Sequence, residues 1–200
     1  MRPHVLAVPP TRRPDHPVAP HFPARWSPRA FAGTPVTAAE VQVLLEAARW
    51  APSASNNQPW RFVWALRGEP AFDAIASALV AFNQTWADKA GALIVVASKG
   101  TVTGSDGIEK PNQWAEFDAG AAWMGLAMQA LHSGLVAHAM GGFVPADLAR
   151  AVGLPADHKL HAVVAIGHQG PAETLPETLR PRETPSDRLK LADIARHGSF

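Results

Sequence analysis

Apolar side chains recur along much of the chain at the spacing of one face of a helix. Over residues 37–50, the apolar positions of this face are Val41, Leu44, Leu45 and Ala48. Thr37, with Glu40 three residues later, forms a capping box that marks the start of this helix. The same spacing predicts a helix from residue 70 to about residue 80 and a short helix over residues 145–152, which ends at a glycine.

The longest helical pattern covers residues 113–135, and it is apolar around most of its circumference. One row consists of Phe117, Ala121, Met124, Met128, Leu131 and Leu135. The row beside it consists of Trp123, Leu126, Ala127 and Ala130. Because a helix that is apolar on most sides must be buried, we expect it to be either the central helix of the domain or part of a dimer interface.

Four runs of β-branched, aromatic or aliphatic residues predict strands over residues 61–66, 92–97, 136–139 and 161–167. The run at 92–97 is continuously apolar, as in a strand that is buried on both faces. Residues 99–112 are rich in Gly, Thr and Asp, and they predict a long loop.

The two ends of the chain lack this periodicity. Residues 1–24 are rich in proline, which predicts an N-terminal arm that is either extended along a surface or disordered, without a catalytic role. Ser27 before Pro28 has the pattern of a helix N-cap followed by proline at the first helical position. Pro and Glu predominate after the last strand, so residues 169–200 are expected to form a C-terminal arm that wraps the partner subunit. One domain spans residues 25–168 between these arms.

Composition narrows the class of protein. The chain has 200 residues with 47% apolar content, which suits one globular domain with appended arms. Lysine and arginine number 18 against 17 acidic residues without a long run of either sign, so we expect a small-molecule partner, not nucleic acid or a membrane. The absence of cysteine and tyrosine excludes disulfides, thiolate chemistry and a phenolic acid. No apolar run is long enough to span a bilayer and the start lacks a signal-peptide core, which predicts a cytoplasmic protein.

Polar residues gather in the connection between the first long helix and the first strand, residues 51–60. They are Ser53, Ser55, Asn56, Asn57 and Gln58. Such residues are common in plain turns, and they also occur where a loop binds a ligand. Gly141 and Gly142 leave a similar choice, because they indicate either a turn that needs positive φ or a backbone that approaches a ligand closely.

Charged and titratable residues also leave alternatives open. Arg25 and Arg29 form either an ordinary surface pair or, beside free backbone N–H groups, a fork suited to phosphate. His138 is either a structural histidine or one that meets a substrate. His158 and His161 are three residues apart, but no nearby carboxylate completes a ligand set, so we expect no metal site.

Five stretches, taken together, resemble the FMN-dependent nitroreductase family. In chain order they are Arg25-Trp-Ser-Pro-Arg-Ala-Phe31, Ala51-Pro-Ser-x-x-Asn-x-Gln-Pro-Trp60, Asn83 ahead of the Ala92 strand, Gly134-Leu-Val-Ala-His-Ala-Met-Gly-Gly-Phe143, and a last strand followed by Arg180-Pro-Arg182. The resemblance covers about residues 25–185 and rests on the shared order and spacing. It implies an α+β fold, namely a three-layer α/β/α sandwich around a mixed, mainly antiparallel sheet. It also implies an intertwined homodimer with two FMN sites at its interface.

The resemblance further implies which residues bind FMN. Those expected at the phosphate and part of the ring are Arg25, Trp26, Ser27 and Arg29, joined at the phosphate by Arg180 and Arg182. Those expected to reach the flavin of the other subunit are Pro52, Ser53, Ala54 and Asn56. The ring edge is expected to meet Asn83, and flavin N5 the backbone of Gly141 and Gly142. No catalytic side chain is expected, because the flavin carries the redox step.

The implied activity is hydride transfer from NAD(P)H through flavin N5 to a nitroaromatic, quinone or similar small acceptor, in a ping-pong cycle. Two alternatives stay open: another flavin task, such as dehalogenation, dehydrogenation or flavin fragmentation, and flavin binding without turnover. The chain departs from the family at Trp86, where many members carry Lys or Arg, and at Gly141, where others carry Glu. These departures bear on nicotinamide preference and on the shape of the substrate.

Overall fold

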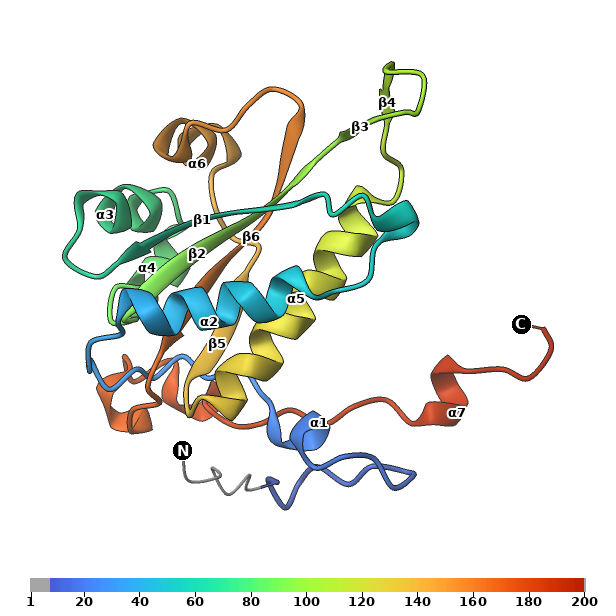
Figure 1. The fold of residues 1–200 in the computed structure, drawn as a ribbon. Helices are drawn as coiled ribbons and strands as arrows, with labels where there is room; N and C mark the ends of the chain where they lie inside the picture. Colours follow the sequence, from blue (N-terminus) through green and yellow to red (C-terminus); the bar gives the residue numbers. More distant parts are fainter. Residues whose placement is uncertain (1–7, 200) are drawn as a thin grey trace.

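A four-stranded sheet forms the middle of the molecule in the computed structural model, which describes residues 8–199 (Figure 1). The strands, in spatial order, are β1 (Trp60–Leu66), β2 (Ala92–Lys99), β6 (His158–Gly167) and β5 (Val136–Met140). All three pairings between them are antiparallel. The predicted α+β class with an antiparallel sheet is therefore confirmed. Residues 1–7 of the predicted N-terminal arm and residue 200 lie outside the described residues.

Helices cover both faces of this sheet (Figure 1). One face carries α2 (Ala38–Arg49) and α5 (Ala115–His132), and the other carries α3 (Pro70–Ser77), α4 (Ala81–Ala87) and α6 (Pro145–Val152).

The side chains of β2 explain the three layers. Leu93 and Val95 pack into the core beside α3 and α6, whereas Ile94 and Val96 pack into the core beside α2 and α5. Successive side chains of a strand point to opposite faces, so a continuously apolar strand supplies both cores at once. The prediction of a strand buried on both faces is confirmed.

The local signals at helix ends hold in detail. Thr37 Oγ1 accepts a hydrogen bond from the Glu40 backbone N at 3.2 Å, and the Glu40 carboxylate accepts one from the Thr37 backbone N at 2.8 Å. This is the predicted capping box at the start of α2. Gly153 ends α6 with φ of 61°, a left-handed conformation that glycine adopts without steric cost.

Two local predictions are wrong. Residues 99–112 are not one long loop but contain a hairpin of β3 (Thr101–Thr103) and β4 (Glu109–Pro111), with a turn in which Gly107 has φ of 75°. No helix begins at Ser27, because residues 25–30 are irregular and lead into Phe31, which bridges to Gln169. Pairing with a segment far along the chain overrides the local capping signal.

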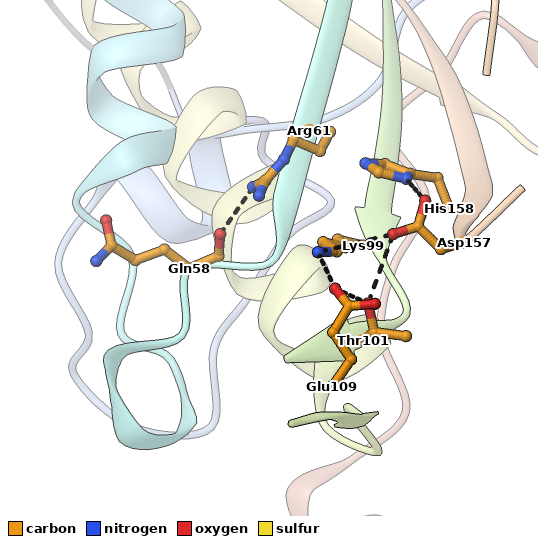
Figure 2. Close-up of polar contacts among 7 residues, drawn as sticks. All are labelled: Gln58, Arg61, Lys99, Thr101, Glu109, Asp157 and His158. Carbon is orange, nitrogen blue, oxygen red and sulfur yellow. Dashed lines mark hydrogen bonds and ion pairs between the residues drawn. The ribbon is translucent and has the colours of Figure 1, made fainter. Parts of the chain in front are cut away.

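A polar cluster holds the base of this hairpin against the start of β6 (Figure 2). Lys99 Nζ lies 2.7 Å from the Glu109 carboxylate and 3.8 Å from the Asp157 carboxylate. Thr101 Oγ1 donates to the same two acids, and His158 Nδ1 lies 2.8 Å from Asp157. All these groups are mutually paired, so the cluster serves to anchor the hairpin.

The long helix α5 is buried on one side only. Leu126, Ala127 and Ala130, from the second predicted apolar row, are buried against the sheet and α2. In the first row, Phe117 is 75% exposed and Met124 38% exposed in the single chain, whereas Leu135, just beyond the helix, is buried. The interior role is thus confirmed for one row, whereas Phe117 and Met124 of the other row remain available to a second subunit.

The two arms run side by side at the end of the molecule that carries the short helix α1 (His21–Ala24) (Figure 1). Arg12 Nε donates to the Ser186 carbonyl at 2.9 Å, and the Leu191 backbone N donates to the Asp15 carboxylate at 2.9 Å. The remaining short elements of the chain are η1 (Ala54–Asn56), η2 (Ala172–Thr174), η3 (Arg180–Arg182) and α7 (Leu191–Ile194). Within residues 8–199, none of the helices combines the length and the apolar content needed to cross a membrane.

Candidate functional site

A cavity of about 580 Å³ lies where the arms meet the edge strand β5, and its walls are rich in arginine. The lining residues are Arg12, Arg25, Trp26, Ser27, Arg29, Phe82, His138, Arg182, Thr184, Ser186 and Arg188. Five of these are arginines, and none of the lining side chains is a carboxylate. Concentrated positive charge without acids in the same wall favours an anionic ligand.

The first basic motif forms one wall of this cavity. Arg25 is half-buried, and its pKa lies below its usual value because of burial and, secondarily, the nearby Arg188 charge. Its Nη1 donates to Ser27 Oγ at 3.3 Å. The Arg29 guanidinium lies 5.9 Å from the centroid of the Trp86 ring, and its buried Nε has no hydrogen-bond partner among the described residues. An unsatisfied buried donor of this kind fits a site whose acceptor is a ligand.

The backbone beside this motif is not free. The Glu183 carboxylate accepts hydrogen bonds from the backbone N of Arg29 at 2.8 Å and 2.9 Å and from that of Ala30 at 2.8 Å. The hypothesis that Arg25 and Arg29 stand beside free backbone N–H groups is therefore wrong. Binding of an anion here depends on side chains.

His138, on β5, lines the same cavity as a neutral acceptor. Its Nδ1 lies 3.0 Å from the Pro28 carbonyl, which places the ring hydrogen on Nδ1 and leaves Nε2 as the acceptor. Burial lowers the pKa of His138 to about 4; the Pro28 bond opposes this shift, and the Arg29 charge adds to it. The Trp86 ring packs 4.6 Å away, centroid to centroid. His138 thus has a structural bond and also a place in the wall of the site.

Asn83, next in the chain to the lining residue Phe82, contacts Gly142 without itself lining the cavity. Asn83 is buried, and its Nδ2 donates to the Gly142 carbonyl at 2.9 Å. A Cβ added at Gly142 would lie 2.7 Å from Asn83 Nδ2, so this glycine allows the close approach. Neither Gly141 nor Gly142 has positive φ. A Cβ added at Gly141 would meet nothing within 4 Å, which leaves the backbone there open to a ligand.

The tail contributes differently from what the motif implies. Arg182 lines the cavity, with its guanidinium 5.8 Å from the Phe82 ring centroid. Arg180 does not line it, because its guanidinium donates to the carbonyls of Leu175 at 3.0 Å and Glu173 at 3.2 Å.

Sequence reasoning missed two arginines of the cavity, Arg12 and Arg188. Both lie in the arms, which lack hydrophobic periodicity. The one feature of the sequence that could have indicated them is that they are basic residues near the chain ends.

The polar loop at residues 51–60 differs from the cavity, because its backbone is strained and its polar residues are uncharged. Ser55, Asn56 and Gln58 have φ of 50°, 53° and 48°, in the left-handed region where each non-glycine residue costs about 1–2 kcal/mol. Ser53 Oγ accepts from the Gln58 backbone N at 3.0 Å, and the Arg61 guanidinium donates to the Gln58 carbonyl at 3.0 Å. Strain held by such bonds is typical of functional loops.

Helix α5 separates this loop from the arginine cavity. Asp118, 3% exposed in the first turn of α5, accepts from the Ala54 backbone N at 3.2 Å. At the other end of α5, the His132 ring packs 5.5 Å from His21 of α1, close to the first basic motif. Asp118 and His132 are 14 residues apart, about 21 Å along a helix. Pro52, Ser53, Ala54 and Asn56 therefore do not share a site with the cavity residues of the same chain.

The paired histidines form no centre of their own. His158 contacts Asp157, and His161 Nε2 lies 2.7 Å from Ser98 Oγ, across neighbouring strands. Within residues 8–199, no three His, Cys, Asp or Glu side chains come together as a metal site would require.

Comparison with known proteins connects this geometry to one family. The sequence profile described as "Nitroreductase family" matches residues 23–168. A protein of Mycolicibacterium smegmatis, known as an uncharacterized 15.4 kDa protein in the ask 5′ region, is 35% identical over 151 residues, which are 70% of this chain and 97% of that protein.

Solved structures show the same fold. An oxidoreductase containing FMN is 43% identical and superposes with a TM-score of 0.92, covering 94% of this chain and 96% of that chain. A structure from Desulfovibrio desulfuricans in complex with FMN has 25% identity and a TM-score of 0.70, covering 90% and 95%. A nitroreductase family protein from Streptococcus pneumoniae has 18% identity, TM-score 0.70 and coverage of 86% and 96%, and it supports the fold alone.

Proposed function

Since the chain belongs to the nitroreductase family, we propose that it is an FMN-dependent oxidoreductase that passes hydride from NAD(P)H to a small acceptor such as a nitroaromatic or a quinone. The observation that carries this proposal is the arginine cavity, whose lining residue Phe82 precedes Asn83, the partner of Gly142 beside the open backbone at Gly141. A flat ring that bears a phosphate requires positive charge at one end and open space at the other. The arginines offer the first, and the uncrowded backbone at Gly141 offers the second.

The residues of the cavity fit FMN. Arg25, Arg29 and Arg182 would bind its phosphate, and the unsatisfied Arg29 Nε supplies a donor that awaits an acceptor. His138, neutral and with Nε2 free of the Pro28 bond, would accept from a hydroxyl group of the cofactor. Asn83 would bind the ring edge, held in place by its bond to Gly142.

The protein's part in the chemistry is binding and orientation. When bound, FMN supplies the hydride chemistry that connects the nicotinamide to the acceptor. His138 and the arginines of the wall are not general acids near pH 7, since His138 is neutral and the arginines keep their charge. Gly141 leaves room for a flat substrate, because even an added Cβ would meet nothing within 4 Å.

We further propose that the working unit is a homodimer. The strained loop at Pro52–Asn56 and the arginine cavity lie at opposite ends of α5, so one chain cannot bring both to one flavin. The exposed apolar row with Phe117 and Met124 gives a second copy a surface to cover. In this arrangement each loop completes the site of the other subunit.

Steady-state oxidation of NADH or NADPH with a nitroaromatic or quinone acceptor tests the activity, and flavin release on denaturation identifies the cofactor. We expect a yellow protein that releases FMN, not FAD. Absence of turnover with bound FMN would favour flavin sequestration, and turnover with only other acceptors would favour another flavin task. A colourless protein that cannot be reconstituted with FMN would refute the proposal.

Replacing Arg29 by Ala is expected to weaken FMN binding by about 1.5–3 kcal/mol, the range for a hydrogen bond to a charged group. Titration of the apoprotein by flavin fluorescence measures this. Arg150→Ala is the matched control, because Arg150 is exposed and pairs with Asp147 on α6, away from the cavity wall. Equal FMN affinity in the Arg29 and Arg150 variants would place the phosphate elsewhere.

A further inference from the structure

One arginine of the N-terminal arm joins two segments that border the cavity, residues 23–25 and the C-terminal arm at Ser186. Arg12 is only 8% exposed, although it precedes the first helical turn and the family-like region. Its Nη1 donates to the Arg25 carbonyl at 2.5 Å and to the Pro23 carbonyl at 3.2 Å. Its Nε donates to the Ser186 carbonyl at 2.9 Å, 174 residues away in the sequence. A planar guanidinium fork can donate to both segments at once in fixed directions, whereas an ammonium group lacks this fork geometry.

These contacts bring like charges together. Arg25 and Arg188 lie on the two segments that Arg12 joins, and all three guanidinium groups line the cavity. The pKa of Arg12 is below its usual value because of burial first, and then because of the nearby charges of Arg188 and Arg25. Asp187 offsets part of this repulsion, but it is not in the cavity wall. Repulsion of this kind persists only where other bonds hold the groups, and an anion relieves it.

We propose that Arg12 is a positioning residue for the phosphate subsite: it ties the C-terminal arm to the first basic motif, so that Arg25 and Arg188 act on one phosphate group. The inference rests on the proposed function, because the phosphate is taken to be that of FMN. It assigns a role to the N-terminal arm, which lies outside the part of the chain that matches the family. Arg188 is then the residue of the C-terminal arm that the tie brings to the phosphate.

The test compares Arg12→Met and Arg12→Lys with Arg13→Met in the full chain. Arg13 is the matched control, since it is exposed, adjacent and makes no hydrogen bond to the cavity segments. Hydrogen–deuterium exchange of amides 184–191 measures how firmly Arg12 holds the C-terminal arm through Ser186, and it needs no ligand. Binding of FMN and of riboflavin, which lacks the phosphate, reports the subsite.

Both Arg12 variants are expected to exchange faster over 184–191 and to bind FMN about tenfold more weakly, the lower end of the effect of a charge-assisted contact. Their riboflavin affinity and the behaviour of Arg13→Met are expected to match the native chain. Arg12→Lys keeps the charge but loses the fork, so native behaviour of this variant would overturn the proposal in favour of charge alone. Unchanged exchange, unchanged FMN affinity, or equal weakening of FMN and riboflavin would also overturn it.

Failure of the proposed function gives a different result. If the native chain binds neither FMN nor riboflavin, inorganic phosphate is the probe. Phosphate that slows exchange over 184–191 in the native chain but not in Arg12→Met would support the tie and the anion subsite without FMN. If phosphate slows exchange equally in the native chain and in Arg12→Met, or slows it in neither, the inference is overturned.

Discussion

The arginine cavity and the polar loop are two ways of preparing a binding surface in one chain. The cavity gathers five arginines on ordinary backbone, and bonds from distant segments hold them together. The loop carries no charged side chain between Ser53 and Gln58, but three of its residues are in the left-handed region. The cavity stores electrostatic repulsion, and the loop stores conformational strain.

This difference predicts how each region responds to change. Repulsion among the arginines depends on salt and bound anions, and protonation of His138 at low pH adds to it, so the cavity should respond to solution conditions. Strain in φ depends on residue type and on the bonds that hold the backbone, so the loop should respond to substitution. The three predictions below test this contrast.

The largest effect on stability is expected from protonation of His138 as the pH falls. Its pKa is about 4 in the folded chain against 6.5 in the unfolded chain, so the unfolded state binds the proton more readily. Neutral His138 contributes about 3 kcal/mol to the free energy of unfolding. This contribution is complete above pH 6.5 and is lost as the pH falls towards 4. Urea denaturation at pH 7 and pH 4.5 measures it, and His138→Gln should remove this part of the pH dependence. An exposed histidine replaced in the same way, His197→Gln, should leave it unchanged; an equal slope in both variants would contradict the prediction.

A smaller effect is expected where the loop is held to α5. Asp118→Ala leaves the Ala54 backbone N–H without its acceptor, which should cost about 2 kcal/mol of the free energy of unfolding. Asp118→Asn keeps an oxygen acceptor and should restore most of the loss. Glu116→Ala, on an exposed ion pair of the same helical turn, should cost less than about 1 kcal/mol. Exchange of the Ala54 amide provides a local measurement, and an unchanged rate in Asp118→Ala would show that this bond does not hold the loop.

The smallest effect is expected from relief of strain. Ser55→Gly removes a cost of about 1 kcal/mol at φ of 50°, and the greater chain entropy of glycine offsets about half of it, so unfolding should require about 0.5 kcal/mol more. Ser105→Gly, in the exposed hairpin turn without positive φ, should destabilise the chain slightly. Thermal unfolding compares the two. If Ser55→Gly destabilises the protein as much as Ser105→Gly does, Ser55 is not strained.

The amino-acid sequence by itself determined the features that depend on near neighbours. The capping box at Thr37, the helix that ends at Gly153 and the doubly buried strand around Ile94 follow from side chains a few residues apart. The five family motifs belong here too, because their order and spacing are linear properties. They indicated the arginine wall and the Asn83–Gly142 contact, whose residues the structure brings together.

Only the tertiary structure decided which polar groups meet across long distances in the sequence. The Glu183 carboxylate accepts hydrogen bonds from the backbone N–H groups of Arg29 and Ala30, and Arg12 donates one to the Ser186 carbonyl. No local pattern in the sequence links these residues. Arg180 turns to carbonyls of its own segment while Arg182, two residues later, enters the cavity. Contacts of this kind depend on how the arms fold back over the domain, and their geometry results from burial and hydrogen bonding in three dimensions.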